Sequence, residues 1–111
     1  MNLITDSRGD VLLVTVKEAR IDAASAIQFK DTMRNVPDSG EKRIVLDISE
    51  VTYLDSSGLG AIVAAMKHFG SSRPLEISGP TPTVAKVFRL TRMDTIFKIY
   101  PDLDAAMSQA A

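Results

Sequence analysis

The segment Arg43–Ile48 constrains the fold of this chain more than any other. Its residues, Arg-Ile-Val-Leu-Asp-Ile, are apolar at positions of both alternating faces of an extended strand. A strand of this kind belongs in the interior of a sheet that is covered on both sides. The chain has 111 residues, the common size of one domain. We therefore expect residues 1–111 to form a single α/β domain built on a central sheet.

Three further segments have strand character. The β-branched run Val11–Val16 follows a turn signal, and Leu3 with Ile4 can form a partner strand across that turn. A short strand is expected at Pro74–Ile77, and a last strand or turn at Thr95–Tyr100.

Helical segments alternate with these strands. Apolar residues recur at helical spacing from Ala23 to about Val36, and again from Leu59 through Met66 to about Phe69. A third helix is expected after the Thr81-Pro82 cap signal, and a fourth from Pro101 to about Gln109. The alternation predicts a mixed, partly parallel sheet of about four to five strands packed with about four helices.

Composition excludes several classes of function. Thirteen basic and fourteen acidic residues give a formal net charge of −1, which argues against a dedicated nucleic-acid binder and against electrostatic attachment to an acidic membrane. The absence of cysteine removes disulfides, thiolate zinc sites and cysteine nucleophiles, and fits a reducing compartment. The first residues lack the pattern of a signal peptide, and the apolar run Leu59–Met66 is too short to span a bilayer. We expect a cytoplasmic protein.

Residues for enzyme chemistry are hard to find. His68 is the only histidine, and it lies late in an apolar helix. We interpret it as a side chain at the helix end, near the negative end of the helix dipole, and not as a catalytic base. The sequence has no cluster of carboxylates with the spacing of a metal site, and it has no glycine-rich phosphate-binding loop. A nucleophile elbow at Ser57 would need glycine where Asp55 stands. The spacing of Asp6 and Asp10 does not supply the acidic pair of a receiver domain. The sequence predicts no catalytic residue, no metal and no cofactor.

The segment Asp55–Gly60, Asp-Ser-Ser-Gly-Leu-Gly, stands out at the start of the second apolar helix. Helix capping explains one hydroxyl or carboxylate there. It explains less well two glycines in the first turns, since each weakens a helix by about 0.5–1 kcal/mol relative to alanine. Capping and a recognition or modification site both remain open. Asp22, Asp47 and Asp55 all fall near strand ends, where sites of α/β sheets collect.

The segment Tyr53–Gly60 resembles the STAS family, specifically the bacterial anti-sigma-factor antagonists. The resemblance extends to Arg43–Ser49, to the Ala19–Asp22 turn and to Thr81–Val84 with Val87-Phe88, and covers about Val11 to Ala106. Two residues depart from the family pattern, since Ala19 and Arg92 stand where glycine is common.

The resemblance implies a switch protein rather than an enzyme. In the family, a serine kinase that is also an anti-sigma factor phosphorylates the serine after the motif aspartate, which is Ser56 here; Ser57 is the less favoured acceptor. The unphosphorylated antagonist binds the kinase and frees its client regulator, phosphorylation ends binding, and a PP2C-type phosphatase restores it. The nucleotide belongs to the kinase. The residues expected to contact the partner are Asp22, Asp55, Ser57, Gly58 and Leu59.

Two other functions fit these residues less well. A non-switching STAS subunit that docks to the cytoplasmic ATPase of an ABC transport complex would need a stable docking face, and the intact Ser56-Ser57 pair favours the switch. A serine hydrolase is poorly supported, because no histidine is positioned as a base.

Overall fold

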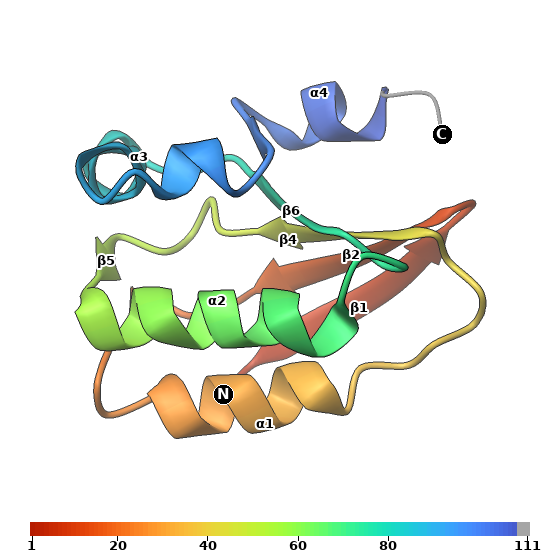
Figure 1. The fold of residues 1–111 in the computed structure, drawn as a ribbon, viewed down its shortest axis with the longest axis horizontal. Coiled ribbons are helices and arrows are strands. Elements are labelled where there is room, and N and C mark those ends of the chain that lie inside the picture. The colour runs from red at the N-terminus through yellow and green to blue at the C-terminus, as the bar shows by residue number, and fades with distance from the viewer. Residues whose placement is uncertain (109–111) are drawn as a thin grey trace.

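The computed structural model describes residues 1–108, and a mixed five-stranded sheet forms its centre (Figure 1). The strand order is β1-β2-β4-β6-β7, in which β1 is antiparallel to β2 and all other neighbours are parallel. The strands are β1 (Leu3–Arg8), β2 (Val11–Val16), β4 (Arg43–Asp47), β6 (Leu75–Ser78) and β7 (Ile99–Tyr100). The sheet and its parallel pairing confirm the expected α/β class.

Four helices and a short ribbon complete the fold. The helices are α1 (Ala26–Arg34), α2 (Ser56–Phe69), α3 (Pro82–Leu90) and α4 (Leu103–Met107), with a 3-10 turn η1 (Met93–Thr95) between α3 and β7. The strands β3 (Arg20–Ile21) and β5 (Tyr53–Leu54) pair in parallel as a ribbon apart from the main sheet. None of the helices within residues 1–108 is long and apolar enough to cross a membrane.

The central strand β4 is buried along its whole length, as its sequence predicts. Ile44 and Leu46 face the larger core, which α1 and α2 cover as they lie side by side (Figure 1). Val45 faces the smaller core on the other side, where Ala106 of α4 packs. Two covered faces explain why β4 shows no alternation of apolar and polar residues.

A buried polar network lies beneath α4. Arg43 Nε donates to Glu76 Oε1 at 3.0 Å, and the Tyr100 hydroxyl donates to the same oxygen at 3.1 Å. The Arg43 guanidinium also donates to the Ala106 carbonyl at 2.6 Å. Because each buried polar group finds a partner, the network fastens the last helix to the sheet without leaving an uncompensated charge.

Several element boundaries differ from the sequence expectation. Helix α1 begins at Ala26 rather than Ala23, because residues 22–25 form a turn held by side-chain hydrogen bonds. Within the segment Thr95–Tyr100, Thr95 ends η1, Ile99–Tyr100 forms β7, and residues 96–98 belong to neither element. Helix α4 ends at Met107, and Gln109 lies outside the described residues. Arg92, one of the two departures from the family pattern, has φ = 63°, a left-handed conformation in which glycine is free of strain.

Candidate phosphorylation and partner-binding site

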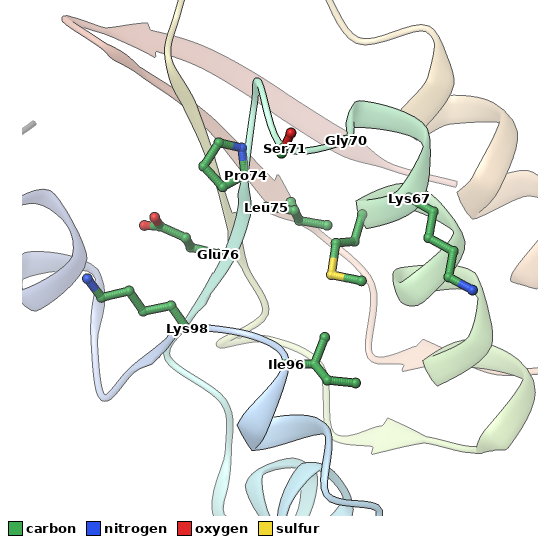
Figure 2. A pocket seen from close by; sticks show the side chains of 9 residues that line it. Lys67, Gly70, Ser71, Pro74, Leu75, Glu76, Ile96 and Lys98 are labelled. Carbon is green, nitrogen blue, oxygen red and sulfur yellow. The ribbon is translucent and has the colours of Figure 1, made fainter.

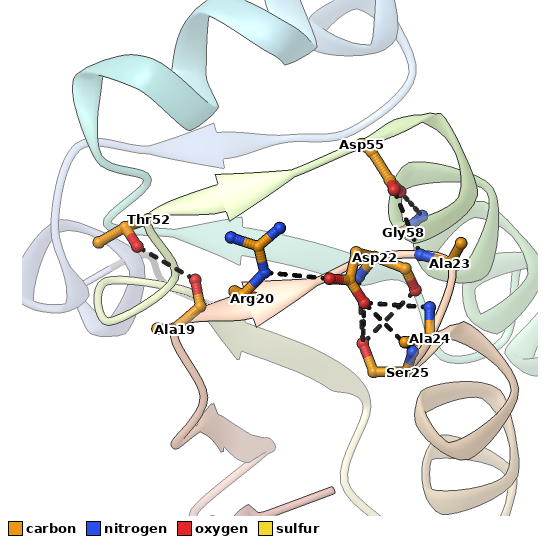
Figure 3. Close-up of polar contacts among 9 residues, drawn as sticks. All are labelled: Ala19, Arg20, Asp22, Ala23, Ala24, Ser25, Thr52, Asp55 and Gly58. Carbon is orange, nitrogen blue, oxygen red and sulfur yellow. Dashed lines mark hydrogen bonds and ion pairs between the residues drawn. The ribbon is translucent and has the colours of Figure 1, made fainter.

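Asp55 is the N-cap of α2 and also ties that helix to a second loop. Its Oδ1 accepts a hydrogen bond from the Gly58 backbone at 2.8 Å, and its Oδ2 accepts one from the Ala23 backbone at 3.2 Å (Figure 3). The first bond is ordinary helix capping. The second holds the loop between β3 and α1 against the start of α2. One carboxylate therefore fixes both segments of the candidate site.

Ser56 and Ser57, the first two residues of α2, are exposed. Neither hydroxyl makes a hydrogen bond to any residue within 1–108, so the cap is Asp55 alone and Ser57 is a neighbour of the cap. In an α-helix the first backbone N–H groups have no acceptor within the helix, and they carry the positive end of its dipole. A negative group attached to either serine would lie close to these donors.

The two glycines of the segment have different surroundings. A Cβ atom added at Gly58 would lie 2.0 Å from the Ile21 carbonyl oxygen and 2.9 Å from a methyl carbon of Leu54. A Cβ atom added at Gly60 would meet nothing within 4 Å, and Gly60 is exposed. Gly58 is therefore required by close packing of α2 on the ribbon, whereas nothing inside the described chain requires Gly60.

Gly58 and Leu59, expected among the partner contacts, are both buried. Leu59 is 7% exposed and belongs to the larger core. These two residues support the site from inside. The exposed surface above them comes from Ser56, Ser57 and Gly60.

Asp22 organises the turn that leads into α1. Its Oδ1 accepts hydrogen bonds from the backbone of Ala24 at 3.1 Å and from the Ser25 hydroxyl at 3.2 Å, while its Oδ2 accepts one from Arg20 Nε at 3.0 Å (Figure 3). The Arg20 hydrogen bond, followed by those from Ser25, holds the pKa of the Asp22 carboxyl below its ordinary value of 3.8. The next residue, Ala23, is the one bound by Asp55.

The lowered pKa of Asp22 predicts that the stability of the fold depends on pH. Because the folded chain binds this proton less tightly than the unfolded chain, the contribution is fully present above pH 3.8 and is lost as pH falls through the lower folded pKa. We expect Asp22→Asn to lower the free energy of unfolding at pH 7, and the difference from wild type to shrink below pH 4. Urea denaturation at pH 7, 5 and 3 measures this; a difference that grows on acidification would contradict it.

Asp47 does not join the other two aspartates. It is the last residue of β4, in the main sheet, and its Oδ1 accepts a hydrogen bond from the Ser49 backbone at 2.9 Å. Asp22 and Asp55, by contrast, follow the two strands of the ribbon and bind neighbouring backbone groups. The ribbon therefore brings together two of the three aspartates that the sequence places near strand ends.

Sequence reasoning missed an arginine–tyrosine stack on the ribbon. The Arg20 guanidinium carbon lies 4.1 Å from the centre of the Tyr53 ring, close enough for a cation–π interaction. Tyr53 remains 42% exposed. The signal that could have found the pair is the parallel alignment of β3 with β5, which places Arg20 directly opposite Tyr53.

The single histidine and one pocket lie at the opposite end of α2 from the serines. A pocket of about 470 Å³ opens at the C-terminal end of α2, with Met66, Leu75 and Ile96 around it (Figure 2). His68 is exposed and packs edge-on against Phe69 with ring centres 5.2 Å apart. Within residues 1–108, no group of three or more His, Cys, Asp or Glu side chains could hold a metal ion.

Comparison with known proteins shows similarity across most of the chain. A Thermotoga maritima protein that carries the name anti-sigma factor antagonist is 33% identical over 100 residues, which are 89% of this chain and 88% of that protein. The crystal structure of an anti-sigma factor antagonist from Thermotoga maritima is 30% identical, with a TM-score of 0.79 over 95% of this chain and 91% of its own. An anti-sigma factor antagonist from Mycobacterium paratuberculosis is 25% identical, with a TM-score of 0.84 over 96% of this chain and 91% of its own.

More distant structures share the fold. The anti-sigma factor antagonist SpoIIAA in its unphosphorylated form is 17% identical, with a TM-score of 0.72 over 96% of this chain and 93% of its own. The phosphorylated form of the Bacillus protein SpoIIAA has a TM-score of 0.65 at 16% identity over 96% of both chains.

The STAS domain family itself matches residues 2–106. The match covers nearly the whole chain, and both the sequence and the fold have relatives among anti-sigma factor antagonists. This chain therefore belongs to the STAS domain family.

Proposed function

We propose that this chain is an anti-sigma factor antagonist, a binding module whose affinity for its partner is controlled by phosphorylation of Ser56. The observation that carries the proposal is the exposed Ser56 hydroxyl. It makes no hydrogen bond to the described residues, and it directly follows the Asp55 cap at the start of α2. A kinase can therefore reach the hydroxyl without breaking an internal contact.

The names of the relatives support a binding role rather than an enzymatic one. The Thermotoga and Mycobacterium proteins are both named anti-sigma factor antagonists. SpoIIAA, which shares the fold, is known in unphosphorylated and phosphorylated forms. The proposed partner of this chain is a serine kinase that is also an anti-sigma factor, and a PP2C-type phosphatase would reverse the modification.

The location of Ser56 suits a switch that leaves the fold intact. A phosphate adds about −1.5 to −2 charge and three acceptor oxygens, a large change for a chain whose formal net charge is −1. The free N–H groups and the dipole of α2 favour a negative group at this point. The unfavourable effect then falls on the bound partner, because Asp55 and the phosphate together concentrate negative charge at the interface.

Transfer of phosphate to the purified chain tests the proposal. A purified serine kinase with anti-sigma activity from the same organism would be incubated with ATP and with wild type, Ser56→Ala or Ser57→Ala. We expect wild type and Ser57→Ala to gain one phosphoryl group by intact mass, and Ser56→Ala to gain none. Equal labelling of Ser56→Ala would place the acceptor elsewhere and contradict the assignment.

A further inference from the structure

We propose that the Arg20–Tyr53 stack on the ribbon is the anchor by which the partner kinase holds the unphosphorylated chain, and that a carboxylate side chain of the kinase binds Arg20. This inference rests on the proposed function and names the contact that the function leaves open. Arginine and tyrosine are among the residues that most often dominate binding energy in protein interfaces. Here both are exposed, and β3 and β5 hold them opposite each other.

Arg20 is held in place before any partner arrives. Its Nε donates to Asp22 Oδ2 at 3.0 Å, and its planar group lies over the Tyr53 ring at 4.1 Å. The ribbon beneath is fixed as well, because the Ala19 carbonyl accepts hydrogen bonds from the Thr52 hydroxyl and from the backbone of Thr52 and Tyr53. A side chain ordered in advance loses little conformational entropy on binding, so more of its interaction energy appears as affinity.

The free side of Arg20 fits a carboxylate. Among residues 1–108, neither terminal nitrogen of its guanidinium has a hydrogen-bond acceptor, and in Figure 3 only Nε is joined to Asp22. The side chain is 59% exposed, and it borders a shallow depression of about 300 Å³ that Ala19 and Ser25 also line. Two parallel N–H groups on a rigid plane match the two oxygens of an aspartate or glutamate.

A kinase carboxylate bound to Arg20 would also be repelled by a phosphate on Ser56. The turn that follows Arg20 is bonded to Asp55 through Ala23, and Ser56 is the next residue after Asp55. A phosphate on Ser56 would therefore add negative charge to the surface of this chain that faces the acidic group of the kinase. Phosphorylation would weaken binding through repulsion of a specific partner group, without any change in the fold.

Affinity measurements on single variants test the anchor. Isothermal titration of the kinase with the full chain, at 50 and 300 mM NaCl, would compare wild type with Arg20→Ala, Arg20→Lys, Tyr53→Ala and Tyr53→Phe. We expect Arg20→Ala and Tyr53→Ala to weaken binding at least tenfold at low salt, and Arg20→Lys to recover only part of the loss, because lysine lacks the planar fork. Tyr53→Phe keeps the ring and should bind nearly as wild type. Arg20→Ala should also reduce the salt dependence of affinity.

Arg8 provides a matched control. Like Arg20 it donates from Nε to the carboxylate of an aspartate two positions away, Asp6, at 2.7 Å, but it lies at the β1–β2 turn at the edge of the sheet. Arg8→Ala should leave affinity unchanged. If Arg20→Ala binds as tightly as wild type while Ser56 still accepts phosphate, the anchor is wrong and the proposed function stands. If no kinase binds the wild-type chain and Ser56 accepts no phosphate, both are overturned.

Discussion

Replacing Gly58 with alanine is expected to lower the free energy of unfolding by about 3 kcal/mol or more, at the upper end of overpacking effects. The added methyl group would lie 2.0 Å from the Ile21 carbonyl oxygen, and this oxygen belongs to the backbone of β3. A flexible side chain could turn away, but here α2 must move off the ribbon or the ribbon must shift. Urea denaturation followed by far-UV circular dichroism measures the change.

Gly60→Ala is the matched control for that prediction. It places the same methyl group two residues along the same helix, where no atom of residues 1–108 outside the adjoining backbone of α2 lies within 4 Å. Because alanine is the better helix former, we expect Gly60→Ala to raise the free energy of unfolding by about 0.5–1 kcal/mol. Equal destabilisation by the two substitutions would contradict the view that Gly58 alone is required by internal packing.

Exchanging Ser56 for aspartate is expected to weaken the complex with the kinase by about 30- to 150-fold, which corresponds to about 2–3 kcal/mol. The new carboxylate would sit beside Asp55 and bring a second negative charge to the surface that the partner covers. Ser56→Ala keeps a small neutral side chain and should bind as tightly as wild type. Titration of the kinase with each purified variant measures both affinities.

Two controls separate charge from other effects in that titration. Thermal melting of Ser56→Asp should match wild type within a few degrees, because a negative charge at the N-terminus of α2 is favoured by the helix dipole. Ser57→Asp places the same charge one residue later, and we expect it to weaken binding less. If Ser56→Asp and Ser56→Ala bind the kinase equally, Ser56 does not act as the switch.

The strands and helices were accessible from the sequence because their periodicity is local. β4 is buried on both faces as its apolar run predicts, and Leu59 and Ile62 of α2 face the core as their spacing predicts. The motif around Asp55 also pointed to a helix start. The sequence left capping and a recognition or modification site as alternatives for this segment. The structure shows that Asp55 caps the helix and that Ser56 is exposed, and modification of Ser56 stays a prediction.

What the sequence left out depends on contacts between distant segments. The β3–β5 ribbon joins residues that are more than thirty positions apart in the sequence. No local sequence pattern therefore predicts the Arg20–Tyr53 stack. Arg43 stands at the start of one apolar run and Glu76 within another, and the two become partners only when β4 and β6 pair. The sequence flagged both glycines of the motif for the same reason, and only the carbonyl of Ile21 distinguishes Gly58 from Gly60.

Peptide mapping of the protein isolated from its own cells tests the central claim most directly. The protein would be purified from growing and from stressed cells, weighed intact, digested and sequenced by mass spectrometry. The account predicts a fraction that carries one phosphoryl group on Ser56, and a change in that fraction between the two conditions. A phosphate on Ser57 would move the site by one residue. Absence of phosphate in every condition, at ordinary protein abundance, would contradict the switch.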